Sequence, residues 1–374
     1  MKKIAIITIT NSGLNFGNRL QNYALQHVSE RYSVQVLSIY SAKSIFGNIW
    51  LSRLRRIAKI LLKSSLRRRC FNYFDKKHIK KAKRIRYEGI NEKSFSGEYD
   101  AFIAGSDQIW NPNFHFNSGF EFLDFADPAK RYSYAASFGV SQVPEKHREE
   151  YSNRLKSLNR ISVREEQGRE IVKHISGRDA PVHLDPTMLL DAEHYATLEE
   201  KPRHPLPDKY LLTYFLGKIP PEYNAFIKES AEQSELQVVE LSESPDSAFY
   251  NCGPQHFLYL IRHAEYICAD SFHGIVFSIL FKKRFTVFSR SDSAASMDSG
   301  SDSAVSMNSG IDNTASMNSR IDTLLNKFGM ESRIFGNLSV DESMKNIPYD
   351  QVEKHLSRER EAAEKYLREI VESL

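Results

Sequence analysis

Short β-branched runs alternate along the chain with longer stretches whose apolar residues recur at helical spacing. In the first half, this pattern predicts a helix at 17–31, strands at 3–10, 33–40, 100–105 and 132–138, and short strands at 161–163 and 182–184. After a proline-bearing break at 202–207, further strands are predicted at 210–216, 236–241, 266–269 and 285–288. Two series of alternating strands and helices predict two α/β units with mainly parallel sheets.

The same pattern divides the chain into three parts with two insertions. We expect an N-terminal unit at 1–200, a C-terminal unit at 201–345 and a charged terminal helix at 346–374. The first insertion, 44–87, is strongly basic. The second, 289–318, holds three copies of the decapeptide Ser-x-x-Asp-x-x-x-Ser-Met-(Asp/Asn), each with too little apolar content to form a core. We interpret this repeat as a solvated loop, with a binding array as the alternative.

Charge is distributed unevenly along the chain. Residues 53–86 hold fifteen Lys or Arg against Asp75 alone, so this stretch carries +14, whereas the whole chain carries +4 and its remainder −10. Large apolar residues such as Trp50, Leu54 and Leu61 recur at helical spacing between the charges. A basic amphipathic helix of this kind is typical of a segment that lies on an anionic membrane surface. One alternative is that the apolar stripe packs on the first domain and the charges are solvated. Binding of nucleic acid is another, and the aliphatic stripe disfavours it.

Targeting signals and cysteine usage indicate the compartment. No run of apolar residues approaches the ~20 needed to span a bilayer, and polar residues follow the first apolar run too soon for a signal peptide. The cysteines, Cys70, Cys252 and Cys268, are odd in number and widely spaced, which argues against a disulfide framework and against a zinc site. We therefore expect a cytoplasmic protein without a metal centre.

Polar residues follow two of the predicted strands in the first unit, where parallel strands present their carboxyl ends. Asn18 and Gln21 lie in a helix that starts soon after the first strand, and Gly17 permits close backbone approach there. Ser106 and Asp107 form a turn after another strand, which exposes a carboxylate to the cleft. The alternatives are a capped helix with solvated polar residues for the first segment and an Asx-turn for the second.

Further strand ends carry charged or titratable side chains. Arg164 ends a short strand and can clamp a carboxylate or phosphate with its planar fork, although an ion pair with Glu165 or Glu166 is the commoner role of a lone arginine. His273 lies where a strand runs through Asp-Ser-Phe-His-Gly into an apolar helix, a position that binds anions and tunes an imidazole. A structural histidine is the alternative. Asp185 also lies at a strand end, where it can line the cleft.

At these motifs the sequence resembles the polysaccharide pyruvyltransferase family. The segments that carry the resemblance occur in the order of the family, at 15–25, 105–110, 162–165, 183–187, 270–278 and 318–325. The resemblance implies a GT-B-like fold with two facing Rossmann-like domains, the first on the acceptor side and the second on the donor side. It also implies phosphoenolpyruvate as donor, a sugar as acceptor, a pyruvate ketal as product, and neither a metal nor another cofactor.

The resemblance assigns roles to single residues. Arg164 matches the arginine that faces the donor, and His273 matches the histidine of the second-domain motif. Some members carry Arg-Leu-His where this chain has Ser271, Phe272 and His273, so a second donor-binding arginine has to come from Arg320 or, as second choice, from Arg290. The implied donor set is Arg164, Ser271, His273, Gly274 and Arg320, and the implied acceptor set is Asn15, Asn18, Gln21, Ser106, Asp107 and Gln108.

Ketal formation requires one group that gives a proton and one that accepts hydroxyl protons. We expect His273 to do the acid–base work, with Asp107 and Asp270 as weaker candidates for a base or for orienting the histidine. Together with the basic segment, this favours an enzyme of exopolysaccharide or capsule biosynthesis that acts on a lipid-linked sugar at the inner face of the cytoplasmic membrane. A nucleotide-sugar glycosyltransferase of the same fold is the alternative, for which the sequence shows no convincing acidic ribose ligand.

Overall fold

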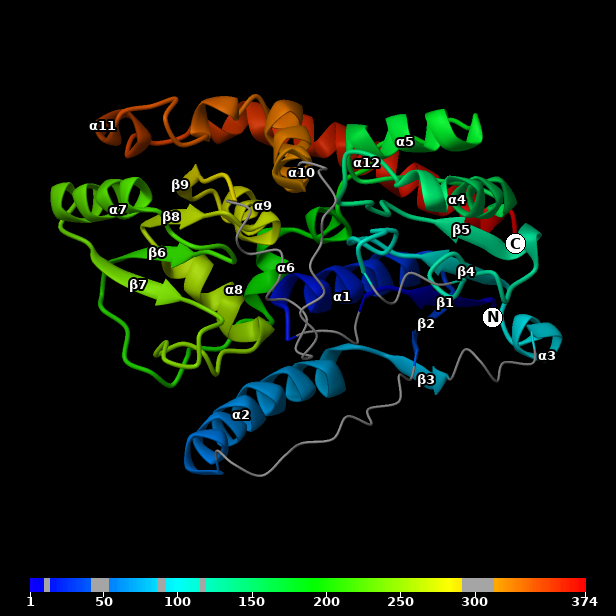
Figure 1. The fold of residues 1–374 in the computed structure, drawn as a ribbon, viewed down its shortest axis with the longest axis horizontal. Coiled ribbons are helices and arrows are strands. Elements are labelled where there is room, and N and C mark those ends of the chain that lie inside the picture. Colours follow the sequence, from blue (N-terminus) through cyan, green and yellow to red (C-terminus); the bar gives the residue numbers. More distant parts are fainter. Residues whose placement is uncertain (10–13, 42–53, 86–91, 115–118, 291–312) are drawn as a thin grey trace.

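The computed structural model describes residues 1–9, 14–41, 54–85, 92–114, 119–290 and 313–374. Figure 1 shows these residues as two α/β units placed side by side, with the N-terminal unit on the right and the C-terminal unit on the left. Each unit is built around one parallel sheet. The two predicted series of strands therefore form two separate sheets.

The sheet of the N-terminal unit has the order β3-β2-β1-β4-β5, and all its pairs are parallel. Its strands are β1 (Lys3–Ile7), β2 (Gln35–Ser41), β3 (Lys81–Ile85), β4 (Ala101–Ala104) and β5 (Arg131–Ser133). The helices of this unit are α1 (Phe16–Glu30), α2 (Leu54–His78), α3 (Glu92–Gly97), α4 (Glu145–Ser157), α5 (Glu166–Ser176) and α6 (Ala192–Ala196). Two short 3-10 helices, η2 (Pro128–Lys130) and η3 (Pro186–Leu189), complete it. Helices on both faces explain why β1 and β4 are almost continuously apolar.

The sheet of the C-terminal unit has the order β7-β6-β8-β9 and is again parallel. Its strands are β6 (Tyr210–Tyr214), β7 (Gln237–Leu241), β8 (Tyr266–Ala269) and β9 (Arg284–Val287). Its helices are α7 (Pro221–Gln233), α8 (Pro254–His263), α9 (Phe272–Leu280), α10 (Asn313–Phe328) and α11 (Val340–Ser343), with a 3-10 turn η5 (Glu331–Arg333). The strands of each sheet run in one direction, so their carboxyl ends lie at one edge of that sheet. These two edges face a common junction between the units (Figure 1).

The structure confirms most predicted elements and corrects the prediction in three places. Residues 161–163 and 182–184 contribute single parallel bridges, Ala136 to Val163 and Val163 to Val182, rather than full strands. Within the basic insertion, α2 extends to His78 and is followed by an edge strand, β3, that was not predicted. The predicted loop at 289–318 is wrong at its end, because α10 already begins at Asn313. The predictions for residues 42–53 and 291–312 lie outside the described part of the chain.

The two units share an apolar core. Phe16 at the start of α1 stacks on Phe257 of α8 with 5.0 Å between ring centroids, and it lies 5.9 Å from the ring of Tyr214 on β6. The predicted terminal helix is α12 (Tyr349–Glu372), and it spans both units. Its Glu359 pairs with Lys327 of α10 at 2.6 Å, and Glu369 pairs with Arg160 of the N-terminal unit at 2.7 Å. Two facing Rossmann-like domains with parallel sheets make the fold GT-B-like.

Helices that could span a membrane are not found: within the described residues, none combines the length and the apolar character that a crossing would require.

Candidate functional site

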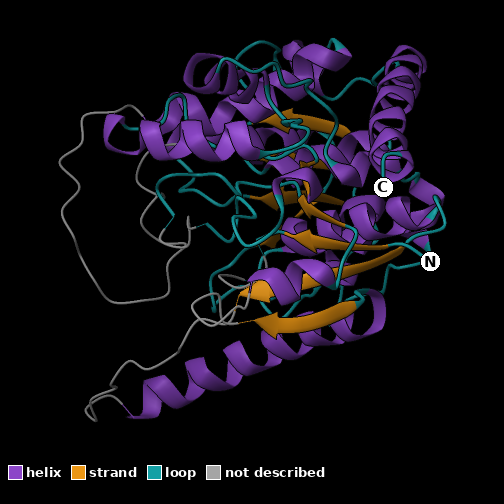
Figure 2. Ribbon diagram, turned by 90° about the vertical axis from the view of Figure 1, so that its right-hand side faces the viewer, coloured by secondary structure: helices purple, strands orange, loops and turns teal. Residues whose placement is uncertain are grey.

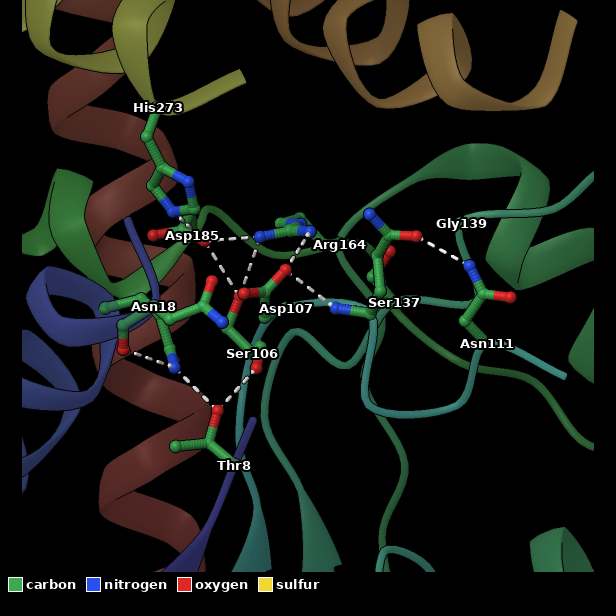
Figure 3. A network of polar contacts seen from close by, with 12 residues as sticks. Thr8, Asn18, Ser106, Asp107, Asn111, Ser137, Gly139, Arg164, Asp185 and His273 are labelled. Atoms are coloured by element: carbon green, nitrogen blue, oxygen red, sulfur yellow. Dashed lines mark hydrogen bonds and ion pairs between the residues drawn. The ribbon is translucent and has the colours of Figure 1, made fainter. Parts of the chain in front are cut away.

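The start of α1 is tied to the end of β1 by polar contacts. Asn15 caps the helix, since its side-chain oxygen accepts a hydrogen bond from the Asn18 amide at 3.1 Å. The fully buried Gln21 donates through Nε2 to Thr8 Oγ1 at 2.6 Å and to the carbonyl of Asn18 at 3.1 Å. Thr8 in turn donates to the carbonyl of Ser106 at 2.9 Å. Figure 3 shows how this network joins the ends of β1 and β4.

The turn after β4 brings Ser106 and Asp107 to the junction of the two units. Asp107 has a φ of 80°, in the left-handed region that Asp tolerates better than most residues, and such strained residues cluster at functional sites. Its Oδ1 accepts from the amide of Gln108 at 2.8 Å, as an Asx-type contact would. Ser106 Oγ donates to Asp185 Oδ2 at 2.8 Å. The turn therefore combines a local backbone contact with a link to another strand end.

Arg164 is buried at the centre of the site. Its Nη1 donates to Asp185 Oδ2 at 2.7 Å and approaches Ser106 Oγ at 3.3 Å, while Nη2 lies 3.6 Å from Asp107 Oδ1. The guanidinium lies over the ring of Phe272, 4.5 Å from its centroid, and so reaches into the C-terminal unit. Burial alone would lower the pKa of Arg164, but the nearby carboxylates, Asp185 first, raise it instead, so the guanidinium stays charged.

Asp185 lies at the start of η3 and is fully buried. Its Oδ1 accepts from the Thr187 amide at 3.0 Å and from Thr187 Oγ1 at 2.6 Å. Its Oδ2 faces Arg164 and lies 3.6 Å from Nε2 of His273. Burial would raise the pKa of this carboxyl, but contact with His273, the charge of Arg164 and the Thr187 hydroxyl hold it well below the usual range. Asp185 is therefore a carboxylate that contacts a guanidinium and an imidazole from different units.

His273 sits in the first turn of α9, whose N-cap Ser271 accepts from the Gly274 amide at 3.4 Å. Its ring rests on α1 of the other unit: a Cβ built at Gly17 would lie 2.0 Å from Nδ1 of His273. Gly17 is thus required for the histidine to occupy this place. Asp270, the other acid of the motif, accepts instead from the backbone amides of Leu216 at 2.7 Å and Gly217 at 2.8 Å.

Two further arginines approach the site from the C-terminal unit. Arg320 of α10 is buried, and burial followed by the positive charge of Arg164 lowers its pKa to about 10. With its amide oxygen turned toward Arg320, Gln108 accepts from Nη1 at 3.0 Å and from Nη2 at 3.1 Å. Arg290 pairs with Asp270 at 3.5 Å and also contributes to the lowered pKa of Arg320. Both candidates for the second donor arginine therefore lie near the first.

His183 and Lys327 were not predicted as parts of the site. They line a cavity of about 10 Å³, room for about one water molecule, together with Arg164, Asp185, Phe272, Arg320 and three aliphatic or hydroxyl side chains. Burial, with a smaller effect of Lys327, lowers the pKa of His183 to about 4, so its ring is neutral at pH 7. Within the described residues, Nε2 of His183 has no hydrogen-bond partner. The order His183-Leu184-Asp185 at a strand end was the signal that could have found this residue.

The chemistry of the site follows from its donors. Arg164 Nε and Nη2, Arg320 Nε and His273 Nε2 are buried, and none of them has a hydrogen-bond partner in the described part of the chain. Buried N–H groups without partners are costly, so their convergence marks a place for a bound anion. No group of three or more His, Cys, Asp or Glu that could hold a metal ion occurs among the residues that the structure describes.

The predicted acceptor residues lie on the N-terminal side of this anion site. Asn15 and Gln21 already have partners in the helix start, and Gln108 lies between Asn111 and Arg320. Asn18 is half-buried, and Asp107 stands beside Arg164. The structure therefore brings all predicted site segments to one junction, with different neighbours for each.

Solved structures with a similar arrangement come from sugar-nucleotide enzymes. The UDP-GlcNAc 2-epimerase of Neisseria meningitidis bound to UDP-GlcNAc is 10% identical over 77% of this chain and 82% of its own, with a TM-score of 0.43. The UDP-GlcNAc 2-epimerase of Methanocaldococcus jannaschii is 10% identical over 77% of this chain and 83% of its own, with a TM-score of 0.40. An alpha-glucosyltransferase in complex with UDP and DNA is 11% identical over 98% and 94%, with a TM-score of 0.43. A comparison with curated protein sequences gives no match.

Two parallel α/β domains with a cluster of buried, unpaired nitrogen atoms at their junction define a GT-B-like fold. The sequence identifies the family. The family model described as polysaccharide pyruvyl transferase matches residues 15–292, which include Arg164 and His273. The chain belongs to the polysaccharide pyruvyl transferase family and is a transferase, and the family implies a sugar or polysaccharide acceptor.

Proposed function

We propose that this protein transfers a pyruvyl group from phosphoenolpyruvate to a sugar of a polysaccharide precursor and forms a cyclic ketal. The observation that carries the proposal is the set of buried nitrogen atoms without hydrogen-bond partners on Arg164 and Arg320, counted within the described residues, with the His273 imidazole facing the same carboxylate as Arg164. Phosphoenolpyruvate carries a carboxylate and a phosphate, and guanidinium groups bind both kinds of anion. Arg290, which pairs with Asp270 at 3.5 Å, is the second choice for the phosphate.

The reaction requires two proton movements and no redox change. Protonation of the methylene carbon turns it into a methyl group and makes the central carbon electrophilic. One sugar hydroxyl adds at that carbon, the C–O bond to phosphate breaks, and a second hydroxyl closes the ketal. One hydroxyl proton replaces the proton given to the methyl group, and the other leaves with hydrogen phosphate. His273 gives and takes these protons, and Arg164 stabilises the charge on the donor. The reaction so written needs neither a metal nor a further cofactor.

Binding and turnover test this proposal separately. Phosphoenolpyruvate should raise the melting temperature of the protein, and phosphate should be released when a panel of lipid-linked sugars is added. UDP- and GDP-sugars serve as competing donors, because the alternative function is transfer of a sugar from a nucleotide. Stabilisation by a nucleotide sugar, with none by phosphoenolpyruvate, would show that the donor has been misassigned. The His273→Gln variant is the matched control: it should still be stabilised by phosphoenolpyruvate but release no phosphate.

The exposed face of α2 supports the proposal of a lipid-linked acceptor. Figures 1 and 2 show α2 along one margin of the molecule. On its described half, Leu66 is 40% exposed and Tyr73 is 47% exposed, and Arg69, Lys76 and Lys77 are exposed as well. Their spacing of three, four and seven residues puts them on one helix face. Such a face suits the surface of an anionic membrane, where each basic residue contributes about 1 kcal/mol. We therefore place the enzyme at the cytoplasmic membrane face, with a lipid-linked acceptor.

Co-sedimentation with liposomes tests this placement. Binding should require anionic lipid, weaken with salt, and fall in a variant with Tyr73, Lys76 and Lys77 all changed to Gln. A matched control changes Lys173 and Lys228 to Gln, because both are exposed on helices away from α2. Equal binding to neutral liposomes, or equal loss of binding in both variants, would remove the membrane role and favour a soluble acceptor.

A further inference from the structure

One carboxylate at the junction contacts both groups to which the proposed reaction assigns a task. Oδ2 of Asp185 lies 2.7 Å from Nη1 of Arg164 and 3.6 Å from Nε2 of His273. The first distance is a charge-assisted hydrogen bond, whereas the second is longer than a hydrogen bond and within ion-pair range. The two partners come from different units, so Asp185 spans the interface between them. Figure 3 shows Asp185 next to both His273 and Arg164.

The two acids that the sequence favoured for this task are engaged elsewhere. Asp270 receives the backbone amides of Leu216 and Gly217 and pairs with Arg290. Asp107 binds the amide of Gln108 and faces the other end of the Arg164 guanidinium. Each therefore has a local structural role, and in the described part of the chain no hydrogen bond or ion pair joins either of them to the imidazole.

Asp185 itself is held firmly. Oδ1 receives the amide and hydroxyl of Thr187, and Oδ2 also receives Ser106 Oγ at 2.8 Å. Three hydrogen bonds from neutral groups therefore fix the carboxylate independently of Arg164 and His273. A buried carboxylate fixed in this way sets the position of whatever it contacts, because a shift of either partner would remove a stabilising contact from a buried charge.

We propose that Asp185 is the positioning residue of the site: it holds the Arg164 guanidinium and the His273 imidazole in one geometry and keeps the imidazole proton on Nε2. The catalytic importance of this positioning rests on the proposed function, whereas the contacts of Asp185 do not depend on it. The opposite edge of the ring, with Nδ1, packs on Gly17 of α1, so the two edges of His273 are each defined by the other unit. A carboxylate 3.6 Å from Nε2 favours the tautomer of the neutral imidazole that carries its proton on Nε2, because the negative charge attracts that N–H group.

The test uses the Asp185→Asn variant of the full-length protein. Its amide can donate to the ring nitrogen, so the neutral imidazole should move its proton to Nδ1. Two-bond 1H–15N correlation spectra of histidine-labelled protein report this tautomer directly, and the His273→Gln variant identifies the signal. This measurement needs no donor or acceptor, so it can fail or succeed independently of the proposed function. In turnover, the variant should lose on the order of 10²-fold or more in kcat and raise KM for phosphoenolpyruvate.

Asp191→Asn is the matched control. Asp191 caps α6 through the His194 amide at 2.7 Å, much as Asp185 caps η3, but it lies outside the site. It should lower the melting temperature slightly and leave the His273 signal and kcat as in the parent protein. If Asp185→Asn does not fold, Ser106→Ala removes one hydrogen bond to Oδ2 and should lower kcat several-fold. A folded Asp185→Asn with the parent tautomer and kcat, or an equal loss in both aspartate variants, would overturn the proposal. If the parent protein releases no phosphate with any acceptor, only the proposed function is overturned.

Discussion

Replacement of Gly17 by Ala tests how closely the two units must approach for catalysis. The added Cβ would lie 2.0 Å from Nδ1, 2.3 Å from Cγ and 2.5 Å from Cε1 of His273. An ordinary van der Waals contact begins at 3.4 Å, so the ring has to move by about 1.4 Å at least. A displacement of about 1 Å at a reacting group can lower a rate by roughly 10²-fold. We therefore expect kcat of Gly17→Ala to fall by about 10²-fold or more.

The fold should tolerate this change better than the reaction does. Ala in a helix is favoured over Gly by roughly 1 kcal/mol, which offsets part of the strain of moving one side chain. The melting temperature should therefore stay near that of the parent, and binding of phosphoenolpyruvate through the arginines should persist. Phosphate release under saturating donor and acceptor measures the effect.

A second glycine serves as the control for this prediction. Gly97 is exposed at the end of α3, and a Cβ there meets no atom within 4 Å, so Gly97→Ala should leave kcat unchanged. Turnover of Gly17→Ala within a few-fold of the parent would refute the argument that His273 works from the place where the structure puts it. An equal loss in both variants would point to a general effect on folding.

Three further predictions concern binding, stability and pH. Arg164→Lys keeps a charge but loses the planar fork that contacts two carboxylates, so KM for phosphoenolpyruvate should rise by about tenfold or more. An unchanged KM would show that Arg164 only forms a structural ion pair. Arg67→Met leaves the carbonyls of Leu14 and Tyr250, both 2.8 Å from the guanidinium, without their hydrogen-bond donor. Urea unfolding should therefore show that the free energy of unfolding falls by about 2–4 kcal/mol, whereas the exposed Arg69→Met should change it little. The pKa of His183 is about 4 in the folded protein, whereas unfolded histidine titrates near 6.5. The free energy of unfolding should therefore fall by up to about 3 kcal/mol between pH 7 and pH 4. A His183→Phe variant whose free energy of unfolding depends on pH in the same way would contradict this assignment.

The strands of both sheets could be predicted from short apolar runs that alternate with helical stretches, because every central strand is buried on both faces. The run Tyr266–Ala269 and its turn into α9 illustrate this, since predicted and observed strand agree. The edge strand β3 escaped the prediction because Lys81, Lys83 and Arg84 give it no apolar pattern, and only its pairing with β2 orders it. The start of α10 inside the repeat was missed for a similar reason, because local composition there resembles a loop.

The site residues could be predicted from their position at the ends of strands, but their contacts with one another could not. Arg164 and His273 were singled out from motif chemistry, and the structure brings them to the same junction. Asp185 was noted only as a residue that could line the cleft, because its two partners belong to different units and only the strand order brings them to it. The place of His183 at a strand end could be seen in the sequence, but its lowered pKa could not, because burial causes it.

The stacking of Phe16 on Phe257, with the return of α12 across both units, has a consequence for how the molecule unfolds. The apolar core is shared, and α12 is anchored to α10 by Lys327 and to the N-terminal unit by Arg160. Neither sheet can lose its packing without exposing the apolar side chains of the other. Cooperative melting is expected when the interface between units is large and apolar. Calorimetry should therefore record a single endotherm for two domains, and a truncated chain without α12 should lose that cooperativity.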